Sequence, residues 1–177
     1  MIYILLVDGF EEIEALETLD IMRRAELSVQ TVGVNDKVVT GAHDIPVTAD
    51  IMLDDLVAGA MDMLILPGGP GHTVLDDDDR VHALINYCMQ YDKYIAAICA
   101  APSILGKRGI AKGKKVTCFP GYEQYMNGAD VTGEKVVCDG KLITAKGAGA
   151  ASDFGFKIVE IMRGKAVADK VKAAMQY

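Results

Sequence analysis

Residues 94–103 have the sequence YIAAICAAPS, in which an apolar run leads directly into Cys99 and a proline follows at position 102. The run predicts a buried strand, and proline is favoured in the first turn of a helix because its missing N–H needs no partner there. The stretch therefore predicts a strand, a sharp turn at Cys99 and then a helix. The N-terminal end of a helix is electrically positive and helps a thiol to ionise, so Cys99 is the candidate reactive residue.

A similar apolar run occurs at Ile2–Val7, and Met61–Leu66 is apolar except for Asp62; segments with helical periodicity separate these stretches. Continuous apolar runs are typical of strands buried on both faces, as in parallel sheets. The alternation predicts an α/β fold of three layers, with a mostly parallel sheet covered by helices on both faces. At this length we expect a single domain, residues 1–177. Further strands are expected at Ser28–Val34, Lys115–Phe119, Val136–Cys138 and Leu142–Ala145, helices at about 11–24, after Asp76–Arg80, at 120–126 and up to Arg163, and a hairpin excursion at Val38–Val47.

The expected topology brings distant residues together. Ligands of open parallel sheets bind beyond the carboxyl ends of the strands, so the loops after the predicted strands share one edge. The loop Pro67–His72 lacks the lysine of a phosphate-binding loop, and we expect it to supply backbone N–H groups as an oxyanion site beside Cys99. The residues expected to converge at this edge are Glu14, Gly68, Gly69 and Cys99.

The composition narrows the function classes. A formal charge of −7 argues against a general binder of nucleic acid or anionic membranes, which needs a basic face. No apolar run approaches the roughly 20 residues that span a bilayer, so no membrane partner is expected. The 4 cysteines lack metal-ligand spacing and only 3 histidines are present, so we expect neither a metal nor another cofactor. Free thiols favour the reducing cytoplasm as the compartment.

Two interpretations of Cys99 stay open on the residues alone. Free cysteines are often inert core residues, whereas a strand-to-helix elbow exposes the nucleophile of α/β hydrolases. That elbow has flanking glycines, and Ala97 and Ala101 stand in their places here. A nucleophilic cysteine usually needs a base, and the pattern places no histidine beside Cys99, so a conventional Cys-His hydrolase is not supported.

Four blocks of the sequence are similar, in order and spacing, to the ThiJ/PfpI superfamily. They are DGFEEIE at 8–14, LPGG at 66–69, AAICAAP at 96–102 and DFG at 153–155, and they cover essentially the whole chain. They most resemble its DJ-one-like branch, the Parkinson-disease deglycase and its bacterial relatives. The resemblance implies a flavodoxin-like sandwich related to class I glutamine amidotransferases, and a homodimer.

The resemblance also implies an activity and a set of site residues. The activity is that of a cofactor-independent glyoxalase or deglycase, acting on reactive α-oxoaldehydes or glycated thiols and amines, with a role in oxidative stress protection. Cys99 would be the reactive, oxidation-prone cysteine and Glu14 the glutamate beside it. Nearby backbone groups would come from Gly68, Gly69 and Ala100.

The chain departs from the superfamily pattern at three positions. Some members carry a histidine where this chain has Phe119, which removes the obvious general base. The proteolytic branch carries a histidine directly after its cysteine, and Ala100 at that position argues against a peptidase. Relatives often have an arginine that reaches into the partner subunit, where this chain has His43. We hypothesise that His43 crosses the dimer interface toward Glu14 and Cys99 of the other subunit.

Glu14 beside Cys99 poses an electrostatic constraint. An ionised carboxylate disfavours a thiolate, whereas a protonated carboxyl donates a hydrogen bond to it. We therefore expect the two groups to share one proton and titrate as a coupled pair, with Glu14 serving as acid and base. The same pair also fits a second function, a non-enzymatic redox sensor or redox-regulated chaperone that uses oxidation of Cys99.

Overall fold

The computed structural model describes residues 1–177, and its centre is a seven-stranded sheet in the order β10-β11-β7-β6-β1-β2-β5. Every neighbouring pair is parallel except β10–β11, which is antiparallel. The predicted mostly parallel α/β sheet is confirmed. The strands of this sheet are β1 (Ile2–Leu6), β2 (Val29–Gly33), β5 (Ile51–Met52), β6 (Met63–Leu66), β7 (Tyr94–Ile98), β10 (Val136–Asp139) and β11 (Leu142–Ala145).

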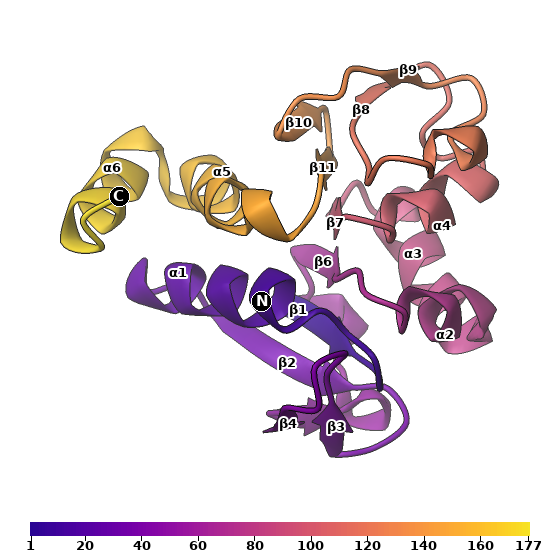
Figure 1. Ribbon diagram of the computed structural model, residues 1–177. Helices are drawn as coiled ribbons and strands as arrows, with labels where there is room; N and C mark the ends of the chain where they lie inside the picture. The colour runs from indigo at the N-terminus through magenta and orange to yellow at the C-terminus, as the bar shows by residue number, and fades with distance from the viewer.

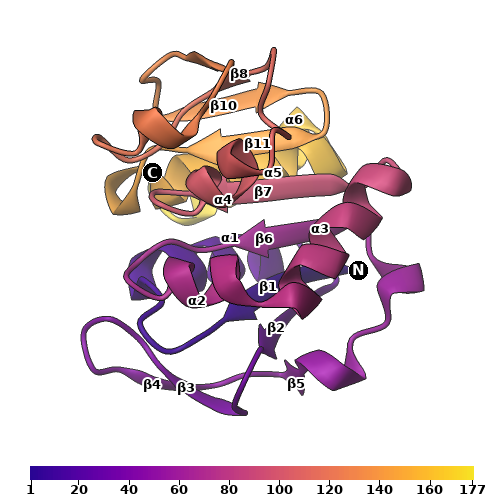
Figure 2. The same cartoon turned by 90° about the vertical axis from the view of Figure 1, so that its right-hand side faces the viewer.

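Helices cover both faces of the sheet and give the expected three layers (Figure 1 and Figure 2). One face carries α1 (Thr18–Arg24), α5 (Ala151–Arg163) and α6 (Lys165–Ala174). The other face carries α2 (His72–Asp77), α3 (Asp79–Gln90) and α4 (Pro102–Lys107). None of these helices combines the length and the apolar character needed to cross a membrane.

The inner strand β1 shows why the sequence folds in this way. Successive side chains of a strand point to opposite faces, so a strand covered on both sides must be apolar throughout. Ile4 packs in the core under α1 and α5, and Leu5 packs in the core under α3 and α4; both are fully buried. Burial of each side chain stabilises the fold by about 1.5–3 kcal/mol. A polar residue at either position would face an apolar layer.

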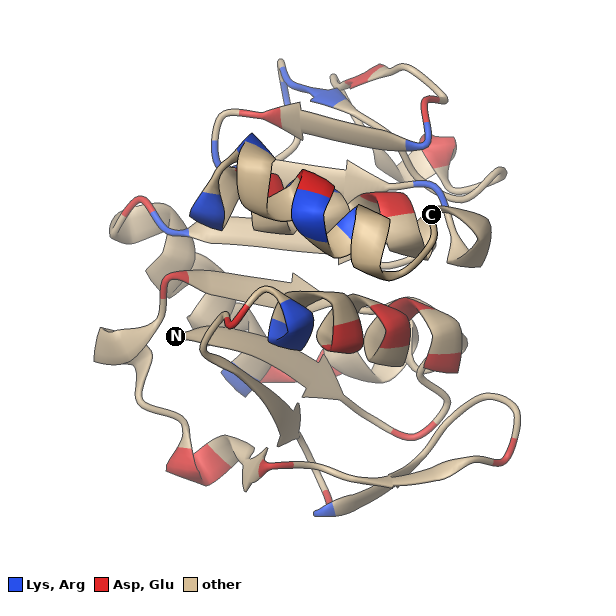
Figure 3. Cartoon of the chain, turned by 90° about the vertical axis from the view of Figure 1, so that its left-hand side faces the viewer, with Lys and Arg blue, Asp and Glu red and all other residues tan.

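The surface of the α1, α5 and α6 face carries mixed charge. Figure 3 shows lysines and arginines interspersed with acidic residues along these helices, and they do not gather into one basic area on this side. Such a pattern is typical of a solvated helix surface with local ion pairs. Arg24 and Asp20 of α1 form one at 2.6 Å, and Lys165 and Asp169 of α6 form another at 2.6 Å.

Two elements close to Cys99 differ from the sequence-based prediction. The strand expected at Lys115–Phe119 is reduced to β8 (Lys115–Val116), which pairs with β9 (Asp130–Val131) in a small sheet of its own. The chain leaves that ladder because the Phe119 N–H donates instead to the Cys99 carbonyl oxygen, at 2.8 Å. The segment expected to be a helix at 120–126 is a single 3₁₀ turn, Glu123–Tyr125.

The predicted helix at 11–24 begins differently from the prediction. Its first part, Ile13–Glu17, is a π-helical turn, and regular α-helix starts only at Thr18. Such turns contain an extra residue and occur often at functional sites. The acidic run at 76–79 also divides, because α2 already extends to Asp77 and Asp78 is the N-cap of α3. The predicted excursion is confirmed as the hairpin β3 (Val38–Thr40) and β4 (Pro46–Thr48).

Candidate active site

Cys99 lies at the turn between β7 and α4, as its sequence context predicts, and its backbone has φ +65°. This left-handed conformation is uncommon for a residue with a side chain and is typical of functional sites that the surrounding structure holds in place. The Cys99 N–H donates to the Ala145 oxygen at 2.9 Å, and its carbonyl accepts from Phe119 at 2.8 Å. The strained turn is therefore fixed by segments from both sides.

Glu14 is positioned by the π-helical turn and is 1% exposed. Its Oε2 accepts a hydrogen bond of 2.8 Å from the Gly68 N–H. Its Oε1 is buried without a partner of good hydrogen-bond geometry, and the Cys99 thiol lies close enough to shift the pKa of this carboxyl. An ionised oxygen in such surroundings is costly, because burial removes the water that would solvate it.

The two groups oppose each other electrostatically. Burial raises the pKa of Glu14 to about 7, although the Cys99 thiol and the Gly68 N–H act in the opposite direction. Burial and then the Glu14 carboxylate raise the pKa of Cys99 to about 12, while N–H groups of Ala100 and Gly69 lower it. A neutral Glu14 removes its part of that increase and becomes a donor to sulfur. The geometry thus fits a pair that shares one proton.

The glycine loop is shaped by the lack of side chains. A methyl group on Gly68 would lie 2.6 Å from Cys99 Cβ and 2.6 Å from Glu14 Oε2, so only glycine leaves room between these residues. Gly69 has φ +85°, and a methyl group there would lie 2.5 Å from the Gly9 oxygen. The structure brings all the expected loop groups to Cys99, but the Gly68 N–H is already donated to Glu14. The N–H groups that face the sulfur are those of Gly69 and Ala100.

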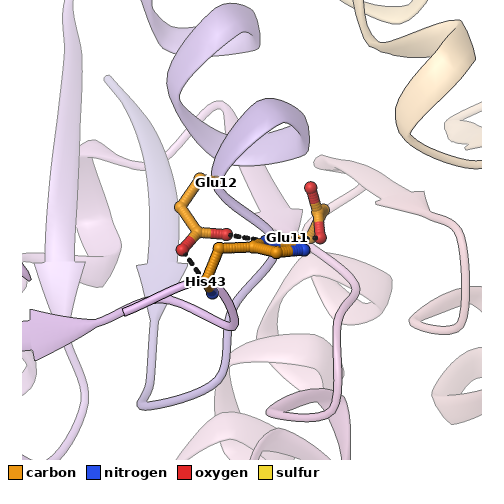
Figure 4. A group of neighbouring side chains, drawn as sticks. All are labelled: Glu11, Glu12 and His43. Carbon is orange, nitrogen blue, oxygen red and sulfur yellow. Dashed lines mark hydrogen bonds and ion pairs between the residues drawn. The ribbon is translucent and has the colours of Figure 1, made fainter. Parts of the chain in front are cut away.

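His43 lies on the tip of the β3–β4 hairpin and is bound to its own chain (Figure 4). Its N–H donates to Glu12 Oε1 at 2.7 Å, and its Nδ1 lies 2.8 Å from Glu12 Oε2. The Glu12 carboxylate, followed by the charge of Glu11, raises the pKa of His43. The ligand atoms of the three residues lie within 4.8 Å of one another, and the ion pair accounts for that arrangement. The His43 ring is 68% exposed, so its approach to a partner subunit stays a prediction.

His72, which the sequence places at the end of the glycine loop, supports that loop. Its Nδ1 lies 2.8 Å from the Gly69 carbonyl oxygen, and its ring packs edge-on against Tyr122 with centroids 5.4 Å apart. The side chain is almost fully buried. His72 therefore supports the backbone of the glycine loop.

A cavity of about 550 Å³ lies next to Cys99, which is not itself among the lining residues. Gly147 and Phe119 line it next to the thiol, and a methyl group on Gly147 would come within 4.0 Å of Cys99 Sγ. Its other walls are Pro120, Lys135, Lys146 and residues 148–150. Neither lysine was predicted from the sequence, because their pairing depends on the register of the hairpin, whose observed loop is Gly140–Lys141.

Comparison with known proteins identifies the family of this chain. The model of a family described as DJ-1/PfpI matches residues 1–161. The chain belongs to the DJ-1/PfpI family. Membership of the DJ-1/PfpI family confirms the resemblance drawn from the four sequence blocks.

Individual members of the DJ-1/PfpI family are similar along most of their length. Protein dj-1beta of Drosophila melanogaster is 36% identical over 166 residues, which cover 92% of this chain and 89% of the relative. The glutathione-independent glyoxalase DJR-1.2 of Caenorhabditis elegans is 33% identical over 156 residues, 87% of this chain and 83% of the relative. A solved structure of the DJ-1 superfamily protein STM1931 from Salmonella typhimurium superposes with a TM-score of 0.94 at 32% identity, covering 99% and 97% of the two chains. The flavodoxin-like fold expected from the resemblance is thereby confirmed.

Proposed function

We propose that this protein is a cysteine-dependent glyoxalase or deglycase that acts on α-oxoaldehydes or their early adducts with thiols and amines. One observation carries the proposal: Cys99 stands in a strained turn against a buried Glu14 whose pKa is raised to about 7. A carboxyl with that pKa gives and takes protons near neutrality, which is the requirement for general acid–base catalysis. A relative named as a glyoxalase supports the same reaction class.

The chemistry begins when the Cys99 thiolate attacks the aldehyde carbon. A C–S bond forms, and the carbonyl electron pair moves to oxygen, which takes a proton from Glu14 to give a hemithioacetal. The N–H groups of Gly69 and Ala100 face the sulfur and stabilise the negative charge that develops beside it. Glu14 leaves this step as the carboxylate and is then the base.

A proton shift completes the conversion without an external oxidant. Glu14 removes the proton from the former aldehyde carbon and returns it to the neighbouring carbon through an enediol. The first carbon is oxidised to a thioester while the second is reduced to an alcohol. One water then hydrolyses the thioester, which releases an α-hydroxy acid and restores the thiol. Phe119 occupies the place of a histidine base, so these proton transfers fall to Glu14.

The test is lactate formation from methylglyoxal by purified protein. We expect Cys99→Ser to reduce the rate to the uncatalysed background, and Glu14→Gln to lower kcat by about 10²–10⁴-fold because its amide cannot accept the proton. Cys138→Ser is the matched control, since Cys138 is an exposed free cysteine away from the turn, and it keeps the wild-type rate. Lactate formation that survives in Cys99→Ser would refute the proposal.

A redox sensor or redox-regulated chaperone is the second candidate, and the same pocket supports it. A protonated Glu14 and the N–H groups of Gly69 and Ala100 can all donate to the oxygens of a Cys99 sulfinate, which would stop oxidation at that stage. Mass spectrometry after peroxide treatment separates the two functions. Trace turnover together with stoichiometric Cys99 sulfinate favours the sensor, whereas rapid turnover favours the enzyme.

We also propose a homodimer, on the basis of the surface around the hairpin tip. Ile13 and Ile45 are each 50% exposed, and in the sequence they lie within two residues of Glu12 and His43, which contact each other. Exposed aliphatic side chains close to one another mark surfaces that bind other proteins. Light scattering after size-exclusion chromatography tests the dimer, and Ile13→Glu should yield a monomer. A structure of the dimer with His43 far from the partner's Cys99 and Glu14 would overturn the crossing hypothesis.

The compartment that we propose is the cytoplasm. All 4 cysteines are free, including the exposed Cys138. Unpaired thiols persist where glutathione and thioredoxin keep them reduced. Fractionation of the native host followed by immunodetection checks the assignment, and recovery of the protein from an oxidising compartment would refute it.

A further inference from the structure

The cavity beside Cys99 is larger than a three-carbon oxoaldehyde requires. Its volume is about 550 Å³, whereas small-molecule sites in general range over roughly 300–1,000 Å³. Gly147 and Phe119 form its wall next to the sulfur, and Lys135 and Lys146 form another part. Gly147 lines the cavity and also lies next to the Cys99 sulfur, and it has no side chain, so a substrate held at Cys99 by its aldehyde can extend past Gly147 toward the two lysines.

The two lysines stand in an arrangement that a sheet normally avoids. The β10–β11 register pairs Val136 with Ala145, and the Lys146 N–H continues it by donating to the Lys135 carbonyl at 2.9 Å. Residues directly opposite each other in an antiparallel pair project to the same face, and like charges in such a pair repel. The hairpin thus holds two positive charges side by side at the cavity.

The two lysines differ in their partners. Lys135 Nζ forms an ion pair with Asp153 Oδ2 at 3.1 Å, but its side chain is 70% exposed and can contact a ligand as well. Lys146 Nζ contacts the Gly133 carbonyl oxygen, at 3.4 Å. The cavity lining includes these two cations and no acidic residue, in a chain whose formal charge is −7. A positive cavity in an acidic protein attracts anions selectively.

We propose that the preferred substrates are α-oxoaldehydes with an anionic tail, whose carboxylate or phosphate binds Lys146 and Lys135 while the aldehyde reacts with Cys99. This inference rests on the proposed function and adds a substrate class to it. Phe119 and Gly147 contact the short aliphatic linker between the two ends. The lysines contact the unreacting end of the substrate, so they determine specificity and take no part in the proton transfers.

The probe is 4,5-dioxopentanoate, an α-oxoaldehyde with a carboxylate two methylenes away, compared with its neutral methyl ester. Addition of water and the internal proton shift convert the acid to 2-hydroxyglutarate. We expect wild type to prefer the acid, and Lys146→Met to lower its kcat/KM about five- to tenfold while the ester changes less than about twofold. Hydroxypyruvaldehyde phosphate against unphosphorylated hydroxypyruvaldehyde shows whether phosphate serves as well as carboxylate. The preference should fall as ionic strength rises.

Lys170→Met is the matched control, because it removes one exposed lysine from α6 and changes the net charge equally. It should leave both substrates unaffected. Equal kcat/KM for acid and ester in wild type would overturn the inference. An equal loss for both substrates in Lys146→Met, or the same loss in Lys170→Met, would overturn it as well.

A binding assay separates this inference from the proposed function. 2-Hydroxyglutarate should slow alkylation of Cys99 by iodoacetamide, its dimethyl ester should not, and Lys146→Met should abolish the protection. Protection without any turnover of methylglyoxal would refute the glyoxalase proposal and keep the anion site. Turnover of methylglyoxal without charge preference or protection would refute the anion site alone.

Discussion

The raised pKa of Glu14 makes a quantitative prediction about stability. Burial raises this pKa from 4.5 to about 7, so the folded protein disfavours the carboxylate that the unfolded chain forms freely. The stabilising effect of a raised pKa is complete below the unfolded value and is lost as the pH rises through the folded value. At 1.36 kcal/mol per pKa unit, the shift corresponds to about 3 kcal/mol of unfolding free energy lost between pH 4.5 and pH 8.

Glu14→Gln isolates this contribution because its amide is neutral at every pH. Its carbonyl accepts from the Gly68 N–H as Glu14 Oε2 does now, so the hydrogen bond of the loop is kept. We expect the unfolding free energy of Glu14→Gln, relative to wild type, to rise by about 3 kcal/mol from pH 4.5 to pH 8. In a protein of this size that difference moves Tm by about 6–12 °C.

The assay is urea unfolding of both proteins at four pH values, followed by circular dichroism. Glu134→Gln is the control, since Glu134 is an exposed glutamate, and its difference from wild type should stay flat over the same range. A difference between Glu14→Gln and wild type that is equally flat would refute the reasoning. It would mean that Glu14 ionises as easily in the folded protein as in the unfolded chain.

Three further predictions concern the turn and its neighbours. Gly68→Ala should lower the unfolding free energy by about 1–3 kcal/mol and abolish lactate formation, because its methyl group would lie 2.6 Å from Cys99 Cβ. Gly59→Ala is the control, since the space around Gly59 is open, and it should change neither quantity. A fully active Gly68→Ala would contradict the packing argument. The alkylation rate of Cys99 against pH should give an apparent thiol pKa about 1–2 units lower in Glu14→Gln than in Glu14→Leu, because only the amide donates to a thiolate; identical profiles would dismiss the coupled pair. Asp78→Ala should cost α3 about 1 kcal/mol in thermal unfolding, because Asp78 Oδ1 accepts from the Arg80 N–H at 2.8 Å, and an unchanged Tm would show that this cap is dispensable.

The sequence was sufficient for the parts of the fold that depend on continuous apolar runs. Ile2–Val7 had to be buried on both faces, and the strand–turn–helix order placed Cys99 at the carboxyl edge of the sheet. The π-helical turn at Ile13–Glu17 left no such signal, because its apolar and acidic residues fit an ordinary helix equally well. Glu14 lies within that turn and is almost completely buried, which periodicity did not indicate.

The segment Lys115–Phe119 shows a second reason why the sequence does not predict every element. Its composition favours a strand, but the backbone of Phe119 pairs with the turn at Cys99 after only two residues of ladder. A tertiary contact therefore overrides local propensity, as it often does in strands. The lysine pair at the cavity depends on the register of a hairpin. The two-residue turn between β10 and β11 sets that register and places Lys135 opposite Lys146.

The hydrogen bond from Cys99 to Ala145 also has a consequence for biosynthesis. The ribosome releases β1, β2, β6 and β7 in an order that lets them pair as they emerge, but β11 closes the far edge of β7 only after 46 more residues. At about 5–20 residues per second, the nascent chain spends several seconds with that edge open and the cysteine unconstrained. The left-handed turn at Cys99 is fixed only after Phe119 and Ala145 have been synthesised and have formed their hydrogen bonds with it. Premature termination beyond β7 would therefore release a chain with a solvent-accessible, unregulated thiol and an unpaired strand edge, which is a substrate for aggregation and quality control.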